Sequence, residues 1–242
     1  MRHLLIGILQ HNKAAVTEKC INKIIAHSDG ITYDIFIIDN GSKDGSGKII
    51  GDLFGSNNNI FIEYQKDNHG VIGGRNLIFK YFSETTKYSH LVFLDNDQFV
   101  KPSWLDGYIK AFSEFPECIT GTEAWIMASN LSPLRKARER DIGFTYIGCG
   151  GMMASREVID KVGVFDDRFN PAYFEDPDYC MRAHSAGIPV VWNTQSQIDH
   201  LPHQTLGQPS IKSSQSFSKS YAKFKAKWKA SMSGGVILCH RV

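Results

Sequence analysis

The sequence predicts an α/β fold in which a mainly parallel central sheet is flanked by helices. Two observations predict it. The first hundred residues alternate short apolar runs with amphipathic segments, and those runs are apolar along almost their whole length. Strands of that kind are typical of a sheet buried on both faces. Because 242 residues with 42% hydrophobic composition are enough for one sizeable core, we expect a single domain over residues 1–242.

The elements of the first half follow one another as strand, helix, strand. The expected strands are Leu4–Gln10, Tyr33–Asp39, Ile60–Gln65 and His90–Asp95. The expected helices between them are Lys13–His27, Gly47–Phe54 and Gly74–Thr85. Three successive β-α-β crossovers result. Open sheets of this kind bind ligands at the carboxyl ends of their strands, so we expect the chemistry in the loops that follow the strands.

The second half has a less regular pattern. We expect helices over 103–114, 156–161, 177–186 and 213–230, and strands over 119–124, 146–154 and 188–192. The polar stretch 129–141 is dense in Arg and Lys and is interpreted as a mobile loop. No internal repeat and no linker between two domains is visible.

Charge, cysteines and hydropathy exclude several classes of partner. Lys and Arg number 27 and Asp and Glu 25, so the net charge of +2 predicts no nucleic-acid partner. The early apolar run Leu4–Leu9 is far shorter than the ~20 residues of a membrane span, which favours a cytosolic location. Five scattered cysteines without a C-x-x-C pair indicate reduced thiols and not a disulfide framework or zinc site.

Asp95 and Asp97 are the first candidates for chemistry. They lie two residues apart where a buried-looking strand ends, so an extended chain would point both side chains the same way. Mg²⁺ and Mn²⁺ accept one or two carboxylates and fill their other positions with water and phosphate oxygens. The pair therefore suits a phosphorylated ligand. The alternative is that one Asp caps the turn before Lys101.

The turn after the second strand, Asp39 to Ser46, is rich in Asp, Asn, Ser and Gly. It is not a P-loop, because the spacing from Gly41 to Gly47 is one residue too long and Ile49 replaces the required Ser or Thr. A dinucleotide fingerprint is also absent after the first strand. Side-chain-to-backbone hydrogen bonds and helix capping could account for the turn without a ligand.

Two further polar segments lie late in the chain. Asp176 is well placed as the N-cap of a helix with Pro177 as its first residue, while the adjacent Glu175 serves a different partner. An aspartate near a helix N-terminus tends to stay ionised, which suits a general base. His200 and His203 form a weak H-x-x-H pattern in a loop. His200 becomes a metal ligand only if it approaches Asp97.

The last helix carries Phe217, Tyr221, Phe224 and Trp228 as one apolar stripe, with several lysines around the rest. Most such stripes dock on a core. The alternative is peripheral contact with a membrane surface or with a lipid-linked diphosphate acceptor.

Taken in order, these segments resemble the inverting glycosyltransferases of family 2, which have the GT-A fold. The resemblance rests on the following segments: Ile8–Lys13, Asp39–Ser46, Asn68–Gly70 with Gly74–Asn76, Asp95–Asp97, Gly150–Ala154 with Val162–Asp166, Phe174–Asp178, Asp199–His200 and Lys227–Trp228. It implies a nucleotide-binding half over 1–100, an acceptor and catalytic half over 101–205, and a C-terminal helix and tail over 206–242.

The resemblance also implies roles for individual residues. Asp176 would be the catalytic base, and Asp97 and His200 would hold Mn²⁺ or Mg²⁺. Acceptor contacts would come from Gly150, Gly151 and Glu175. The residues implied to contact the nucleotide are Gln10, Asn12, Asp39, Asn40, Arg75, Asp95 and Asn96.

The donor implied by the resemblance is a UDP- or dTDP-sugar. The dTDP-sugar is included because Asn40 stands where many relatives carry a second Asp, a pattern shared with rhamnosyltransferase-like members. The acceptor hydroxyl would belong to a glycan or a lipid-linked molecule in surface polysaccharide or glycan synthesis, in the cytoplasm or at the inner face of the membrane.

Two alternatives stay open at this point. One is a sugar-1-phosphate nucleotidyltransferase, whose usual glycine-rich loop with a basic residue is absent from Gln10–Lys13. The other is a non-catalytic nucleotide- or glycan-binding module.

Overall fold

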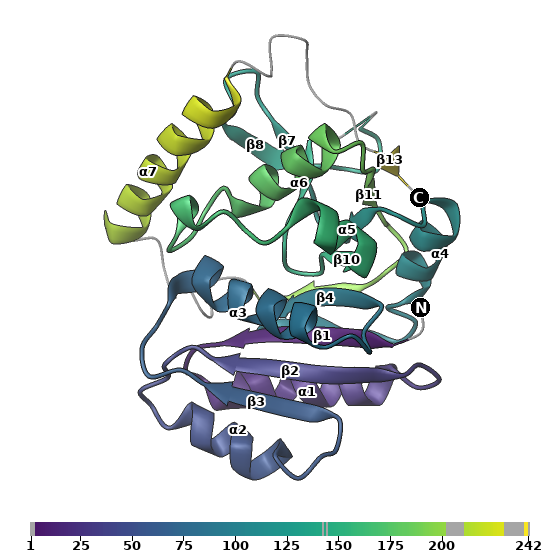
Figure 1. The fold of residues 1–242 in the computed structure, drawn as a ribbon, viewed down its shortest axis with the longest axis vertical. Helices are drawn as coiled ribbons and strands as arrows, with labels where there is room; N and C mark the ends of the chain where they lie inside the picture. The colour runs from purple at the N-terminus through teal and green to yellow at the C-terminus, as the bar shows by residue number, and fades with distance from the viewer. Residues whose placement is uncertain (1–2, 142, 144, 202–210, 230–239, 242) are drawn as a thin grey trace.

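A computed structural model describes residues 3–141, 143, 145–201, 211–229 and 240–241. Its centre is an eight-stranded sheet with the order β13-β11-β6-β10-β4-β1-β2-β3. All neighbouring strands run parallel except β10, which is antiparallel to both β4 and β6. The expected mainly parallel sheet flanked by helices is therefore confirmed (Figure 1).

The bounds of the elements are as follows. The strands of the central sheet are β1 Leu4–Gln10, β2 Tyr33–Asp39, β3 Ile60–Tyr64, β4 His90–Asp95, β6 Ile119–Gly121, β10 Met153–Ser155, β11 Val190–Trp192 and β13 His240–Arg241. The remaining strands are β5 Gln98–Val100, β7 Ala124–Met127, β8 Pro133–Lys136, β9 Tyr146–Ile147 and β12 Ile198–His200. The helices are α1 Ala14–His27, α2 Ser46–Phe54, α3 Gly70–Glu84, α4 Asp106–Glu114, α5 Arg156–Val162, α6 Glu175–Ser185 and α7 Ile211–Trp228, with a 3₁₀ turn at Asp167–Phe169.

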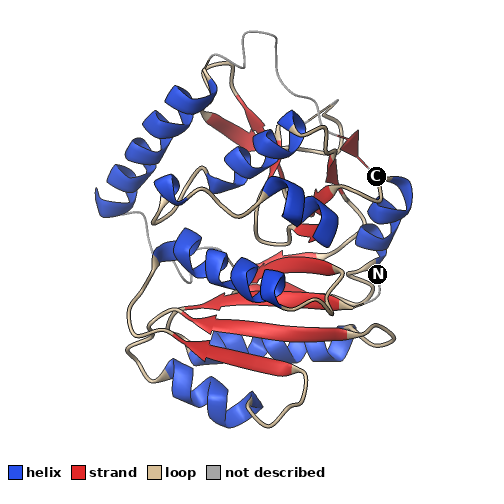
Figure 2. Cartoon of the chain, viewed as in Figure 1, coloured by secondary structure: helices blue, strands red, loops and turns tan. Residues whose placement is uncertain are grey.

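Strand β1 lies inside the sheet and is buried along its whole length. Leu4, Ile6 and Ile8 pack in the same cluster as Ile21 and other residues of α1. The opposite face packs against α3, and its approach to β1 is close: a Cβ added to Gly7 would come within 2.4 Å of the Ile78 side chain. Glycine at this position therefore lets α3 lie directly on the strand. Figure 2 shows α3 and α1 on opposite faces of these strands.

The expected strand 146–154 is wrong as a single element. It divides into β9 and β10, which belong to different sheets. The glycines between them turn the chain: Gly151 has φ 84, and its carbonyl accepts a hydrogen bond of 2.6 Å from the Tyr108 hydroxyl. Glycine reaches this left-handed conformation at little cost, so the chain can leave one sheet and enter the other.

The stretch 129–141 is not wholly a loop, because Pro133–Lys136 forms β8 and pairs with β7. The sequence pattern missed this strand because it is so rich in basic residues. Those charges have partners: Lys136 Nζ lies 2.8 Å from Glu123 Oε1, and Arg135 binds Asp141 through two hydrogen bonds of 2.6 and 2.9 Å.

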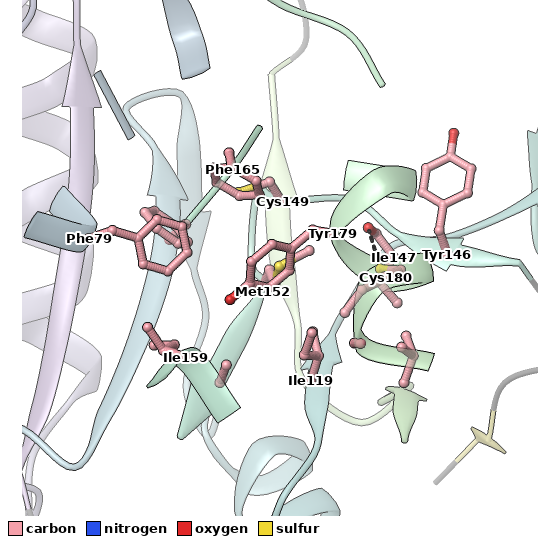
Figure 3. Packing of buried hydrophobic residues seen from close by; sticks show 14 of the residues in the cluster. Phe79, Ile119, Tyr146, Ile147, Cys149, Met152, Ile159, Phe165, Tyr179 and Cys180 are labelled. Carbon is pink, nitrogen blue, oxygen red and sulfur yellow. Dashed lines mark hydrogen bonds between the residues drawn. The ribbon is translucent and has the colours of Figure 1, made fainter. Parts of the chain in front are cut away.

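Aromatic side chains join the two halves of the chain. Phe79 of α3, Phe165 and Tyr179 of α6 contact one another, with ring centroids 5.1 to 5.8 Å apart. Figure 3 shows these rings packed with Met152 and Ile159 between the helices and the sheet. Helix α6, which carries the candidate base, is thereby fixed to the same core as α3.

The apolar stripe of α7 docks on the domain. Phe224 is fully buried, and its ring lies 5.2 Å from that of Phe174. The Trp228 indole N–H donates to the buried Asp178 at 2.9 Å. Lys225 and Lys229 stay exposed on the other side. Within the described part of the chain, no helix combines the length and the apolar character needed to cross a bilayer.

Candidate functional site

The acidic pair and the late histidine meet at the carboxyl end of β4. Asp95 ends β4 and Asp97 lies in the turn that follows it. The short strand β5 begins directly afterwards and pairs antiparallel with β12, with Gln98 opposite His200. His200 Nε2 therefore lies 3.3 Å from Asp97 Oδ1, and one ligand atom from each of Asp95, Asp97 and His200 falls within 4.8 Å of the others.

This set of side chains fits a divalent cation. Carboxylate oxygens are the ligands that Mg²⁺ and Mn²⁺ prefer, and an imidazole adds a ligand that transition metals accept. Asp97 is 3% exposed, so a carboxylate is held there at the bottom of the site. Hydrogen bonds with Asp97 and Glu123 raise the pKa of His200 to about 10. The imidazole must lose this proton before it can bind a metal.

Glu123 belongs to the site although the sequence pattern did not indicate it. Its Oε1 lies 3.7 Å from His200 Nδ1 and 2.8 Å from Lys136 Nζ. Burial would raise the pKa of Glu123, but the hydrogen bonds from His200 and Lys136 outweigh it and lower the pKa. A carboxylate at the second nitrogen of a metal-binding histidine fixes the orientation of the ring. No sequence motif marks Glu123, which lies in the bend between β6 and β7.

Arg75 connects the acidic pair to α6. It lies on α3, is 6% exposed, and its Nη2 lies 2.6 Å from Asp95 Oδ1. Its Nη1 lies 3.4 Å from Glu175 Oε1. The sequence predicts that Arg75 contacts the nucleotide, and in the structure this arginine has two carboxylate partners within the protein. The guanidinium ties the end of β4 to the first turn of α6.

The start of α6 differs from the expectation. The helix begins at Glu175, and Phe174 occupies the N-cap position with φ 70 and no side-chain hydrogen bond. Asp176 is therefore not the cap, because the packing of Phe174 against Tyr221 and Phe224 of α7 starts the helix two residues earlier than expected. The Asp176 side chain is released from capping. Its Oδ1 is buried and has no hydrogen-bond partner within the described residues.

The electrostatic surroundings favour the protonated form of Asp176. Burial raises its pKa well above the usual value, and the neighbouring Glu175 carboxylate raises it further. Arg75 and a backbone hydrogen bond from Cys149 act in the opposite direction. Burial also raises the pKa of Glu175. Two adjacent carboxyl groups with perturbed pKa values beside a cavity are a common feature of catalytic sites.

A cavity of about 350 Å³ joins these groups. Asp95, Asp97 and His200 line it together with Glu175 and Asp176. Gly150 also lines it, and a Cβ at this position would lie 2.8 Å from Asp95 Oδ2, so a larger residue would have to displace that carboxylate. Gly151 lies outside the cavity wall and packs against Tyr108 and Thr122.

The predicted nucleotide loops gather at the carboxyl ends of β1 and β2. Asp39 accepts a hydrogen bond from Ser42, and Asn12 Oδ1 accepts one from the Lys43 backbone at 2.9 Å. The Asn40 side chain is buried and holds the loop before α3: it donates to Asn68 Oδ1 and the Gly70 carbonyl and accepts from the His69 backbone. Asn40 thus connects two loops, and its contact with a nucleotide remains a prediction.

Gln10 and Asn96 are not brought into the cavity. The Asn96 amide donates to the Thr17 hydroxyl of α1 at 2.9 Å. Alternation along β1 places Gln10 on the face covered by α1, where its side-chain amide is fully buried without a partner among the described residues. Neither residue lines the cavity, so their contact with a nucleotide remains a prediction. His203 lies outside the described residues.

Comparison with known proteins identifies the family. The model of glycosyl transferase family 2 matches residues 6–163, which is more than half of the chain. The chain belongs to glycosyl transferase family 2. The matched residues of this family 2 chain include Asp95 and Asp97 and end before Asp176 and His200.

One relative of this family 2 chain is distant in sequence. The chain is 22% identical over 196 residues to the glycosyltransferase AglE of Haloferax volcanii, a match that covers 75% of this chain and 61% of AglE. The chain thus spans less than two thirds of the length of that relative.

Two solved structures resemble the family 2 chain more in shape than in sequence. The structure of GalNAc-T7 with UDP, GalNAc and Mn²⁺ has a TM-score of 0.77 at 13% identity, covering 93% of this chain and 48% of that chain. The mannosyltransferase PcManGT of Pyrobaculum calidifontis, in complex with GDP-Man and Mn²⁺, has a TM-score of 0.67 at 13% identity, covering 97% of this chain and 65% of that chain. These likenesses show the fold, and the expected GT-A fold is confirmed.

Proposed function

We propose that this chain is a metal-dependent inverting glycosyltransferase that moves a sugar from a nucleoside diphosphate to an acceptor hydroxyl. The observation that carries the proposal is that one cavity contains both the Asp95, Asp97 and His200 cluster and the carboxyl group of Asp176, whose Oδ1 has no hydrogen-bond partner among the described residues. The family favours glycosyl transfer over the alternative sugar-1-phosphate nucleotidyltransferase.

The proposed chemistry gives one role to the Asp95, Asp97 and His200 cluster and another to Asp176. Asp95, Asp97 and His200 would hold a divalent cation, whose charge offsets the negative charge on the departing diphosphate. In its ionised form, Asp176 accepts the proton of the acceptor hydroxyl as that oxygen attacks the anomeric carbon, and its raised pKa makes this carboxylate a stronger base. Attack from the face opposite the diphosphate inverts the configuration at that carbon, and one base is sufficient for the reaction.

We propose that one half of the chain binds the donor and the other half binds the acceptor. Residues 1–100 would bind the donor, for which we propose a UDP- or dTDP-sugar; the solved relatives hold UDP or GDP-Man together with Mn²⁺. Residues 101–205 would bind a glycan or lipid-linked acceptor in polysaccharide or glycan synthesis. We place the reaction in the cytoplasm, where a lipid-linked acceptor would bring it to the inner face of the membrane.

Ligand-induced stabilisation tests the donor and the metal together. At 100 times its dissociation constant a ligand stabilises the fold by about 2.7 kcal/mol, which corresponds to roughly 5–11 °C in the melting temperature of a chain of this size. We expect a UDP- or dTDP-sugar with Mn²⁺ to reach this range, and the same sugar with EDTA to fall well short of it. In Asp97→Asn the difference between Mn²⁺ and EDTA should disappear. Equal shifts with and without Mn²⁺ in the wild type would contradict the proposed metal dependence.

Metal binding should release a proton. His200 has a pKa of about 10, so it is protonated at pH 7 and must become neutral to act as a ligand. Below that pKa the apparent affinity for Mn²⁺ should rise about tenfold with each pH unit. Calorimetric titration of Mn²⁺ in two buffers of different ionisation enthalpy measures the proton directly. His200→Gln should bind Mn²⁺ more weakly and release about one proton less than the wild type; an unchanged proton count would exclude His200 as a ligand.

A further inference from the structure

The proposed transfer assigns no role to the residues that form one wall of the cavity. Trp125 of β7 and Tyr146 of β9 line this wall and lie opposite each other in the antiparallel pairing of the two strands. Their rings are almost parallel, at 9°, with centroids 6.4 Å apart. In Figure 3 the Tyr146 ring projects away from the packed residues around Ile147 and Cys180. The small sheet therefore presents two aromatic side chains to the cavity.

Gly148, which has no side chain, lies between Trp125 and the candidate base, and we call the space over its Cα the slot. The Cβ that Gly148 lacks would lie 3.6 Å from Trp125 Nε1 and 3.9 Å from Asp176 Oδ2. The indole N–H has no hydrogen-bond partner in the described part of the chain. The slot is thus bordered by one donor and one carboxyl oxygen. An acceptor hydroxyl needs these two partners, because its oxygen accepts one hydrogen bond while its proton goes to the base.

Aromatic side chains from α7 and from the segment before α6 also line the cavity. Phe217 of α7 lies against Tyr173 and Phe174, with ring centroids 5.5 and 5.2 Å apart, and is 39% exposed. The lining of the cavity thus combines two groups of aromatic side chains with the polar groups of the candidate metal site and the candidate base. Binding sites for small molecules combine apolar walls with a few placed polar groups in this way.

We propose that the acceptor is itself a sugar: a pyranose ring lies against Trp125 and Tyr146, and its attacking hydroxyl enters the slot at Gly148 between the indole N–H and Asp176. This inference rests on the proposed function, because it takes Asp176 as the base. The bond between the anomeric carbon and the acceptor oxygen forms, the bond from that carbon to the diphosphate oxygen breaks with its electron pair, and the hydroxyl proton moves to Asp176.

A pyranose matches this surface better than a polyprenyl chain or a peptide. One face of many pyranose rings consists of C–H groups, which the negative face of an aromatic ring attracts, while the rim carries hydroxyl groups. The attacking oxygen of a polyprenyl phosphate is already ionised, so it has no proton for Asp176 to accept and would be repelled by the Asp176 carboxylate. A serine side chain would fill the slot and leave both groups of aromatic side chains uncovered.

Three variants separate the parts of this surface. Gly148→Ala fills the slot, and it is compatible with the fold because the new methyl group meets no atom closer than 3.6 Å and the backbone needs no left-handed conformation. Trp125→Leu removes the ring and the N–H, and Trp125→Phe keeps a ring without the donor. Tyr64→Leu is the matched control, an exposed aromatic residue of β3 away from the cavity.

Saturation-transfer NMR tests the proposal with small probes: methyl glycosides of glucose, galactose, mannose, N-acetylglucosamine and rhamnose, in the presence of Mn²⁺ and a mixture of UDP, dTDP and GDP. We expect at least one glycoside to bind, with the strongest signals from the C–H protons of one ring face. Gly148→Ala and Trp125→Leu should weaken that glycoside at least tenfold, Trp125→Phe less, and Tyr64→Leu less than twofold, while nucleotide binding stays within twofold in all four.

The nucleotide signals separate this inference from the proposed function. Nucleotide binding without any glycoside binding overturns the sugar acceptor, as does a glycoside whose binding is unchanged in Gly148→Ala and Trp125→Leu. Preferential binding of a polyprenyl phosphate or a serine peptide, added as competitors, also overturns it. Glycoside binding that depends on Trp125 without any nucleotide binding supports the sugar site and contradicts the proposed transfer.

Discussion

Replacing Asp176 with Asn should reduce the rate of sugar transfer at least a hundredfold and leave nucleotide binding nearly unchanged. The amide has the same shape as the carboxyl group but cannot accept the proton of the acceptor hydroxyl. A general base contributes roughly 10²–10⁴-fold to a rate, so its removal should reduce kcat by at least the lower value. The measurement is the initial rate of transfer at saturating donor, together with the dissociation constant of the nucleotide.

The same variant should be more stable than the wild type at neutral and alkaline pH. Burial and the charge of Glu175 raise the pKa of Asp176 in the folded protein, whereas the unfolded chain has the ordinary value. The folded state therefore binds the proton more tightly, and the free energy of unfolding falls as the pH rises from the ordinary pKa through the raised one. An amide does not ionise, so Asp176→Asn should lose this decline. Each kcal/mol regained in the free energy of unfolding raises the melting temperature by roughly 2–4 °C in a chain of this size.

Asp160→Asn is the control for both measurements, because it makes the same chemical change at an exposed position of α5. It should leave the transfer rate unchanged and alter the stability by less than about 0.5 kcal/mol. An Asp176→Asn enzyme that retains more than about a tenth of the wild-type rate would show that another group is the base. A melting temperature that falls to the same extent at every pH would contradict the raised pKa.

The sequence predicts best those elements whose bounds are set by the residue pattern within the element itself. Strands β1, β2 and β4 are continuous apolar runs that end in polar loops, and their bounds agree with the structure to the residue. The position of Asp95 and Asp97 follows directly from the end of β4. Since apolar patterning and strand ends are local properties, no knowledge of distant contacts is needed for this part of the site.

The remaining parts of the site depend on contacts that sequence patterns do not contain. His200 reaches Asp97 only because β12 pairs with β5, and each of these strands has three residues. Strands so short have no periodicity of their own and form where tertiary contacts place them. Glu123 and Trp125 are positioned by the pairing of β7 with β8 and β9, and no motif marks either residue.

At the start of α6, tertiary packing overrides the helix-start preference of the local sequence. Asp176 followed by Pro177 is a favourable beginning for a helix, yet Phe174 takes the cap position in the left-handed region. That conformation costs free energy for a residue with a side chain. The contacts of the Phe174 ring with Phe217, Tyr221 and Phe224 of α7 offset this cost. The position of the candidate base therefore depends on α7 being docked.

Asp178 is the residue that holds α7 to α6, and its replacement by Ala should cause a large loss of stability. Its side chain is fully buried and accepts hydrogen bonds from Trp228 Nε1 at 2.9 Å and Arg182 Nε at 2.9 Å, while Lys227 Nζ lies 2.6 Å away. Removing one partner from a buried ionic cluster typically costs about 3–5 kcal/mol. Here Arg182, Lys227 and the Trp228 N–H all lose Asp178, although Lys227 keeps Asp166 at 2.8 Å. The melting temperature should fall by roughly 6–20 °C in thermal unfolding.

Arg168→Ala is the matched control, since Arg168 binds Asp166 at the solvent-exposed side of the same cluster. An exposed ion pair of this kind contributes about 0–1 kcal/mol, so this variant should melt within a few degrees of the wild type. If Asp178→Ala melts like Arg168→Ala, the buried cluster does not hold α7.

The Asp178 variant should also separate the two halves of the proposed reaction. Asp178 lies two residues after Asp176, and α7 contributes Phe217 to the cavity, whereas the nucleotide loops follow β1 and β2. Below its melting temperature, Asp178→Ala should therefore lose more of the transfer rate than of the nucleotide affinity. Asp178→Asn, which keeps the side-chain oxygen that accepts from Trp228, should retain more of both stability and transfer. Equal losses of transfer and nucleotide affinity would mean that α7 supports the whole domain and not the acceptor side in particular.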